Sequence, residues 1–327
     1  MTTRAIPLAH ARVGGGVTIL ALSVLLLASC SDNDPSGVAE PVPEAPTETD
    51  KTPEPVPDPS GEPAVGPDPA DDGVDDADHA VRSIEIPVGA FTFDALEAGP
   101  ADGELVLLLH GFPQTGDMWR GQIDALSERG YRVVAPNQRG YSSRARPDAV
   151  EDYSRDRLAE DVIGMVDALG HERFHLVGHD WGGTVAWEVA ARHPDRLDSV
   201  TAVSTPHTEA LLAAIDDPEL DQGERSSYVD TLAEEGSEAL FLADDAAMLR
   251  SLYRDAGLTE EEMQPQLDVL NDPDAMRAAL HWYRAWVVGG PATGPSTVPT
   301  LYVWSDGDPA LGPDAAAATV DYVTGPY

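Results

Sequence analysis

The sequence predicts an α/β fold with a mostly parallel sheet, because short apolar runs alternate with segments of helical period. The run Leu105–Leu109 is apolar throughout, which is typical of a strand buried on both faces of a parallel sheet. Strands are expected over residues 83–87, 91–97, 104–109, 131–135, 173–178, 198–203 and 299–304, and helices over 117–129, 155–169 and 182–193.

The stretch 206–294 has a different pattern, which is helical and acidic and contains no buried strand. Because it follows the sixth expected strand, we expect a helical cap inserted at that point of the sheet. Gly289-Gly290-Pro291 and Gly294-Pro295 mark the return to the sheet, since glycine and proline favour loops.

The most specific motif follows the fifth expected strand and reads Gly178-His179-Asp180-Trp181-Gly182-Gly183. Strand, sharp turn and helix are the context of a nucleophile elbow, with Asp180 where a serine is usual. A carboxylate is already ionised at neutral pH and can attack a saturated carbon that bears an epoxide oxygen or a halide. The alternative is a buried structural aspartate in an ordinary crossover connection.

A second motif, His110-Gly111-Phe112-Pro113, comes directly after Leu105–Leu109. In hydrolases with an elbow, the loop at this place and the residue after the nucleophile supply the backbone amides of an oxyanion hole. The expected donors are therefore the amides of Phe112 and Trp181. His110 and His179 are interpreted as structural support.

Together these motifs resemble the soluble, cap-bearing epoxide hydrolases of the α/β-hydrolase fold, and the resemblance covers residues 82–327. It extends through Asn137–Ser142, Leu280–Ala285 and Leu301–Trp304. It implies the opening of small apolar epoxides to vicinal diols by an ester at Asp180 and water, with no cofactor. Haloalkane or haloacid dehalogenases are the alternative, against which Phe112 weighs, because many of them carry asparagine there.

The resemblance also implies the remaining catalytic residues. Tyr283 and Tyr228 of the cap would act as acids, since a neutral phenol can donate a hydrogen bond to the epoxide oxygen. Asp308, in the loop after the strand at 299–304, would orient a histidine, and Asp306 is the competing candidate for that role.

The general base for hydrolysis of the ester is the one catalytic group of the family that has no match in the sequence as given. The family places its histidine after one further strand, and the sequence as given stops at Tyr327. We therefore expect a last strand, the histidine and a closing helix to be missing, as in an incomplete sequence or a shortened protein. Without a base the ester would stall, which leaves a non-catalytic surface binder as a further alternative. His207, at the start of the cap, is a weak substitute.

The N-terminus predicts a secreted, lipid-anchored protein. Arg4 and Arg12 precede a short apolar run at 17–28, which suits a signal peptide and is too short for a membrane span. Leu27-Ala28-Ser29-Cys30 resembles a bacterial lipoprotein cleavage box, so Cys30, the only cysteine, is the expected lipidation site. The expected location is therefore the outer side of the bacterial cell membrane.

The segment 31–80 predicts a disordered tether, because it holds fifteen acidic residues, one lysine, eleven prolines and no aromatic residue. The formal net charge of −38 argues against nucleic-acid binding. The expected organisation is a signal peptide at 1–29, a tether at 30–81, the first part of the hydrolase core at 82–205, the cap at 206–294 and an incomplete second part of the core at 295–327.

Overall fold

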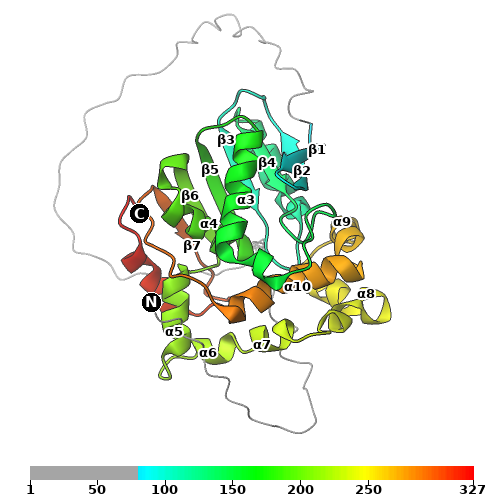
Figure 1. Cartoon of the computed structure of the whole chain (residues 1–327), viewed down its shortest axis with the longest axis vertical. Helices are drawn as coiled ribbons and strands as arrows, with labels where there is room; N and C mark the ends of the chain where they lie inside the picture. Colours follow the sequence, from blue (N-terminus) through cyan, green and yellow to red (C-terminus); the bar gives the residue numbers. More distant parts are fainter. Residues whose placement is uncertain (1–79) are drawn as a thin grey trace, which may run out of the picture. The chain divides into compact units, whose positions relative to one another are not determined.

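The computed structural model describes residues 80–327, and these form a seven-stranded sheet with helices on both faces (Figure 1). All seven expected strands are present, and each end lies within one residue of its expected position. The strands are β1 (Arg82–Val88), β2 (Phe91–Ala98), β3 (Leu105–Leu109), β4 (Arg132–Pro136), β5 (Phe174–His179), β6 (Leu197–Val203) and β7 (Thr300–Val303).

The spatial order of the strands is β1-β2-β4-β3-β5-β6-β7. Strand β2 pairs antiparallel with both β1 and β4, and all the remaining pairs are parallel. The predicted α/β class with a mostly parallel sheet, and the α/β-hydrolase fold, are therefore confirmed. Because parallel strands end at the same edge, the loops after β3, β5 and β7 meet on one side of the sheet.

Strand β3 lies at the centre of the sheet, and all five of its side chains are buried. Leu105, Leu107 and Leu109 contribute to the core under α3 (Arg155–Ala168) and α4 (Trp181–Arg192). Val106 and Leu108 contribute to a second core under α2 (Arg120–Ser127). Strand side chains alternate between the two faces, so a strand covered by helices on both sides has to be apolar throughout.

Helices α3 and α4 begin and end within one residue of their expected bounds, but the first expected helix differs. A short 3₁₀ turn, Gly116–Trp119, precedes α2, and the side chain of Thr115 accepts a hydrogen bond from the amide of Asp117 at its start. The 3₁₀ turn allows the chain to leave the loop after β3 before the α-helix begins.

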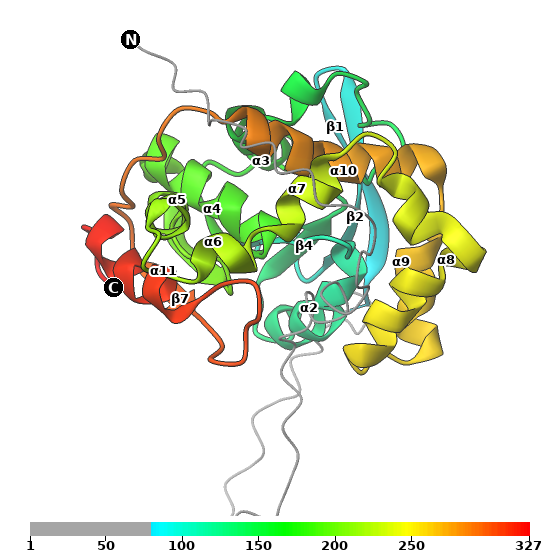
Figure 2. The same cartoon turned by 90° about the horizontal axis from the view of Figure 1, so that it is seen from below.

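Six helices lie between β6 and β7, and Figure 1 shows them together at one end of the sheet. They are α5 (Thr208–Asp216), α6 (Gln222–Arg225), α7 (Tyr228–Ala233), α8 (Glu238–Asp255), α9 (Glu260–Leu270) and α10 (Pro273–Val288). Figure 2, which views the molecule from that end, shows the same helices spread in front of the sheet. After β7 the chain forms one more short helix, α11 (Pro313–Ala318).

Buried hydrogen bonds join this group of helices to the loops after β3 and β4. The hydroxyl of Tyr253 donates to the carbonyl of Pro113 at 2.5 Å, and the side-chain oxygen of Gln266 accepts from the amide of Thr115 at 2.6 Å. Trp282 donates its indole N–H to the carbonyl of Arg139 at 2.9 Å. Since buried polar groups are costly when unpaired, these bonds fix the helices over the strand ends.

The lipidation site at Cys30, the signal peptide and the tether all lie outside the described residues and remain predictions. Within residues 80–327, no helix combines the length and the apolar character that a membrane crossing requires.

Candidate active site

Asp180 is the single residue between the end of β5 and the start of α4. Its backbone has φ of 52° and ψ of −122°, a conformation that residues other than glycine rarely adopt. The amide of Asp180 donates to Val203 at 3.3 Å, and the hydroxyl of Thr205 donates to its carbonyl at 2.7 Å. The turn is thus held in a strained form that directs the side chain away from both elements.

The glycines of both motifs are required by close contacts. A Cβ atom on Gly178 would lie 2.1 Å from the carbonyl oxygen of Gly182, and one on Gly182 would lie 2.3 Å from that of Leu109. A Cβ atom on Gly111 would lie 2.3 Å from the Cβ of Asp180. The elbow and the loop after β3 can pack together only because these positions carry no side chain.

The carboxylate of Asp180 is enclosed and already bound. The amide of Phe112 donates to its Oδ1 at 2.9 Å, and Pro113 follows through a cis peptide bond. Burial raises the pKa of Asp180 to about 6, while hydrogen bonds from the amides of Trp181 and Phe112 oppose that rise. At neutral pH the group is mostly ionised. The two amides that sequence reasoning assigned to an oxyanion hole both stabilise this carboxylate.

The two histidines of the motifs are buried and neutral. The Nε2 of His110 accepts a hydrogen bond from the amide of Gln138 at 3.1 Å, and burial lowers the pKa of His110 to about 4. His179 is also buried, with its pKa lowered to about 4, and its Nδ1 has no hydrogen-bond partner among the described residues. His110 therefore supports the turn after β3, as sequence reasoning expects.

The structure brings both predicted tyrosines close to Asp180. Tyr283 on α10 and Tyr228 at the start of α7 have ring centres 6.3 Å apart, and both line one pocket with Asp180. The ring of Tyr283 packs edge-on against Trp181 at 5.1 Å and Phe112 at 5.4 Å. Burial raises the pKa of both phenols, so both stay protonated and can donate hydrogen bonds.

The pocket above Asp180, which we call the nucleophile pocket, has a free space of about 480 Å³, part of which is open to solvent. Its walls are largely apolar, which suits an apolar substrate. Sequence reasoning missed most of these wall residues: Thr184, Thr205, Leu211, Ile215, Ser226, Val229, Trp286 and Leu311. Trp286 could have been found, because it lies three residues after Tyr283 and so on the same helix face.

Asp308 lies in the loop after β7 and outside the lining of the nucleophile pocket. Its Oδ1 accepts hydrogen bonds from the amides of Ala310 and Leu311, both at 2.9 Å. Burial raises the pKa of Asp308, and the nearby charge of Asp180 adds to the rise. Asp306 is exposed, so the geometry favours Asp308 over Asp306.

His207 is buried away from the nucleophile pocket. Its ring stacks on Tyr322 with centres 4.7 Å apart, and its Nδ1 accepts from the amide of Glu209 at the start of α5. No histidine in the described part of the chain lines the pocket. Within the same residues, no group of three or more histidine, cysteine, aspartate or glutamate side chains is arranged to hold a metal ion.

Comparison of the chain with known protein families and structures agrees with this fold. The model of the alpha/beta hydrolase fold family matches residues 104–322, and the chain belongs to that family. The chain is 34% identical over 253 residues to the AB hydrolase superfamily protein YfhM of Bacillus subtilis. This match covers 72% of this chain and 84% of that protein.

Two further relatives carry a more specific name. Epoxide hydrolase A of Mycobacterium tuberculosis is 32% identical over 277 residues, covering 71% of this chain and 84% of that protein. The solved structure of an M145A mutant of an epoxide hydrolase from Bacillus megaterium is similar with a TM-score of 0.68 at 26% identity. The match covers 75% of this chain and 90% of that one. None of these three relatives is named a dehalogenase.

Proposed function

We propose that this chain is an epoxide hydrolase that acts through an ester on Asp180. The observation that carries the proposal is the hydrogen bond of 2.9 Å from the Phe112 amide to Oδ1 of a buried carboxylate at a strained turn. Two tyrosines, the buried Tyr283 and the half-buried Tyr228, line the same pocket. The likeness to proteins named epoxide hydrolases supports this reaction over other hydrolyses.

In the first step, the Asp180 carboxylate attacks a carbon of the epoxide ring. Because Oδ1 is held by the Phe112 amide, Oδ2 is the oxygen free to attack. A carbon–oxygen bond forms to Asp180 as the ring carbon–oxygen bond breaks. The ring oxygen takes a proton from Tyr283 or Tyr228, which gives a hydroxyl on the substrate and a phenolate on the protein.

In the second step, water attacks the carbonyl carbon of the ester. The negative charge develops on Oδ1, where the amides of Phe112 and Trp181 would stabilise it. Collapse of this intermediate breaks the bond to the substrate oxygen, which takes the proton that the base removed from the water and so completes the diol. The carboxyl proton left on Asp180 passes to the tyrosine phenolate, which restores both groups. The water has to lose a proton to a base, which the resemblance assigns to a histidine oriented by Asp308.

The experiment is to mix the protein with styrene oxide, quench at short times and measure the intact mass. We expect an adduct of the full mass of the epoxide, which fragmentation of the digested protein locates on Asp180. Prolonged incubation in oxygen-18 water with assay of the diol follows the second step, because hydrolysis inserts the label into Asp180. An adduct on another residue, or diol formation that persists in Asp180→Asn, would overturn the proposal.

A further inference from the structure

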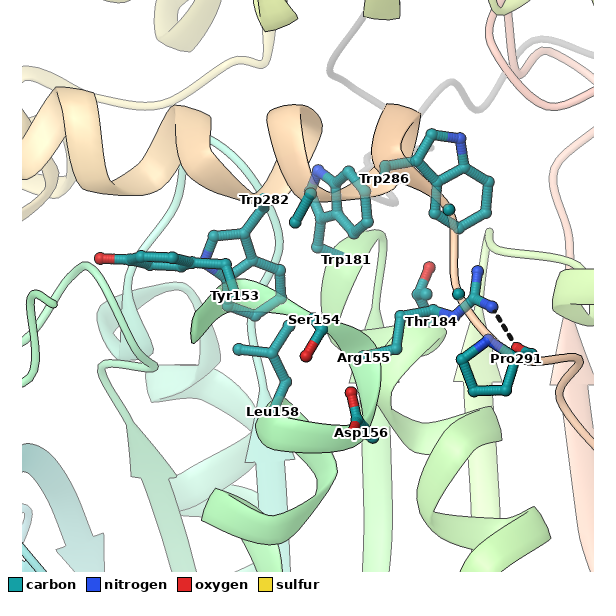
Figure 3. Close-up of a pocket in the computed structure, with 13 residues that line it drawn as sticks. Tyr153, Ser154, Arg155, Asp156, Leu158, Trp181, Thr184, Trp282, Trp286 and Pro291 are labelled. Carbon is teal, nitrogen blue, oxygen red and sulfur yellow. Dashed lines mark hydrogen bonds between the residues drawn. The ribbon is translucent and has the colours of Figure 1, made fainter. Parts of the chain in front are cut away.

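A second pocket lies on the other side of the wall that encloses the nucleophile pocket. We call it the distal pocket; it lies between the start of α3 and the end of α10, and its free space of about 400 Å³ includes space open to solvent (Figure 3). The two pockets share Trp181, Thr184 and Trp286. Because Trp181 follows Asp180 directly, the dividing wall begins one residue from the nucleophile.

Trp286 is the part of this wall that lies nearest to the end of α10. It lies in the last turn of α10, which ends at Val288, and Gly289 follows with φ of 82°. Its indole ring packs edge-on against Trp181 at 5.6 Å and under the guanidinium of Arg155 at 5.3 Å. Neither contact is a hydrogen bond, so neither fixes the orientation of the indole. Rotation of the Trp286 side chain would join the two pockets.

The walls of the distal pocket are mostly apolar, and Arg155 and Asp156 are its two charged residues. Figure 3 shows its guanidinium between Trp286 and Pro291, and one terminal nitrogen donates to the Pro291 carbonyl at 2.7 Å. The Nε–H of Arg155 is buried and has no hydrogen-bond partner among the described residues. The nearest carboxylate oxygen, on Glu188, is 3.9 Å away, which is beyond hydrogen-bond distance.

A buried N–H without a partner is uncommon in folded proteins and is explained when a ligand supplies the acceptor. The charge of Arg155 is already opposed by Glu188, and the carboxylate of Asp156 lines the same pocket. A second carboxylate on the ligand would be repelled by these groups. A neutral oxygen, such as an ester carbonyl, can accept the hydrogen bond without that cost.

We propose that the distal pocket binds the far end of an elongated substrate, an epoxide with an apolar chain that ends in a neutral oxygen acceptor. The epoxide lies at Asp180, the chain passes Trp286, and the acceptor binds the Nε–H of Arg155. Trp286 then limits the length of substrate that reacts. The inference rests on the proposed function, because it places the reacting end of the substrate at Asp180.

The first test uses three terminal epoxides of equal chain length that end in a methyl group, a methyl ester or a carboxylate. The second-order rate of adduct formation on Asp180 is measured for each by intact mass. We expect the ester to react about tenfold faster than the alkyl epoxide, because it gains one hydrogen bond to a charged donor. The carboxylate should react more slowly than the ester. Equal rates for the ester and the alkyl epoxide would overturn the proposal.

Variants assign the preference to Arg155. In Arg155→Met the ratio of the ester rate to the alkyl rate should fall to about one. Arg155→Lys keeps the charge but has no Nε–H, so it should lose most of the preference for the ester. Arg157→Met is the matched control, because Arg157 is an exposed arginine of the same helix and lines neither pocket; its ratio should not change. Thermal unfolding of each variant shows that the fold is retained. A ratio that persists in Arg155→Met would exclude Arg155 as the donor.

Trp286→Ala tests the wall. It should raise the rate for the long epoxides relative to styrene oxide, which is short enough to remain in the nucleophile pocket. An unchanged relative rate would show that Trp286 does not limit length. Failure of the proposed function is recognised separately, because then styrene oxide forms no adduct. In that case, quenching of tryptophan fluorescence by a long-chain methyl ester and its parent alkane still tests the distal pocket.

Discussion

Asp180 and Asp308 are the two carboxyl groups of the candidate site, and the structure holds them in opposite ways. Asp180 is bound by the amide of Phe112, which lies 68 residues earlier and follows a different strand. Asp308 is bound by the amides of Ala310 and Leu311, which lie two and three residues further along the same loop. One position depends on the packing of the sheet, and the other depends on a single turn.

This difference separates the two chemical steps. In the proposed mechanism, the geometry of attack would be set by the packing of β3 against β5, which the described residues contain. The loop of Asp308 is organised locally, so it can change without moving Asp180. Alkylation should therefore respond strongly to changes around Asp180 and hardly at all to changes at Asp308.

The largest effect is expected from Asp180→Asn. The amide is neutral and a poor nucleophile, so adduct formation should fall by at least about 10³-fold, as for other enzymes that lose a nucleophile. The measurement is the rate of adduct formation with styrene oxide, followed by intact mass. Adduct formation that continues at the wild-type rate would show that another residue attacks the epoxide.

The free energy of unfolding of Asp180→Asn gives a second test of the environment of this carboxyl. Because the pKa of Asp180 in the folded state, about 6, is higher than in an unfolded chain, ionisation of this group opposes folding at neutral pH. Asp180→Asn should therefore be more stable than the wild type at pH 7, by on the order of 3 kcal/mol. The difference should disappear below about pH 4, where both states of the wild type are protonated. Urea unfolding at the two pH values measures it.

The next effect is expected from Tyr283→Phe. Removing a proton donor from the ring oxygen should slow alkylation by about 10²-fold, which is the lower end of the range for general acids. Tyr228→Phe is the matched variant, because Tyr228 lines the same pocket and its ring centre lies 6.3 Å from that of Tyr283. If only one variant is slow, that tyrosine is the donor; if neither is slow, the epoxide oxygen is protonated by another group.

The elbow could be predicted from the sequence because its requirements are local, whereas the two tyrosines were indicated only by the resemblance to a family. A Cβ atom on Gly178 would lie 2.1 Å from the carbonyl oxygen of Gly182, so the turn has to carry glycine there, and that constraint appears within five residues of sequence. The strand bounds were predictable for a similar reason, since Leu105–Leu109 is buried on both faces and therefore apolar throughout.

The walls of the pockets could not be predicted, because they depend on how helices rotate over the sheet. Leu211 and Val229 come from different cap helices, and each is apolar in a pattern that fits a core position equally well. Arg155 is a similar case. It begins α3, where a solvated charge is common, and only the structure shows its Nε–H buried without a partner.

The pH dependence of alkylation gives a smaller effect of defined sign. Since the nucleophile is the ionised carboxylate and burial raises the pKa of Asp180 to about 6, the rate should be constant above pH 7. It should fall about tenfold for each pH unit below about pH 5.5. Adduct formation in single-turnover mixing between pH 4.5 and 8 measures the profile. A midpoint near 4 would mean that the two amides stabilise the charge more than burial opposes it.

The smallest effect on alkylation is expected from Asp308→Asn, and it tests the comparison directly. The amide oxygen of asparagine can still accept from Ala310 and Leu311, so the loop should keep its conformation. The rate of adduct formation should change by less than about threefold, because Asp308 acts on Asp180 only through its charge. Removal of that like charge should also lower the midpoint of the pH profile slightly. A loss of alkylation as large as that of Tyr283→Phe would show that the two carboxyl groups work as one unit, and the separation of the two steps would then be wrong.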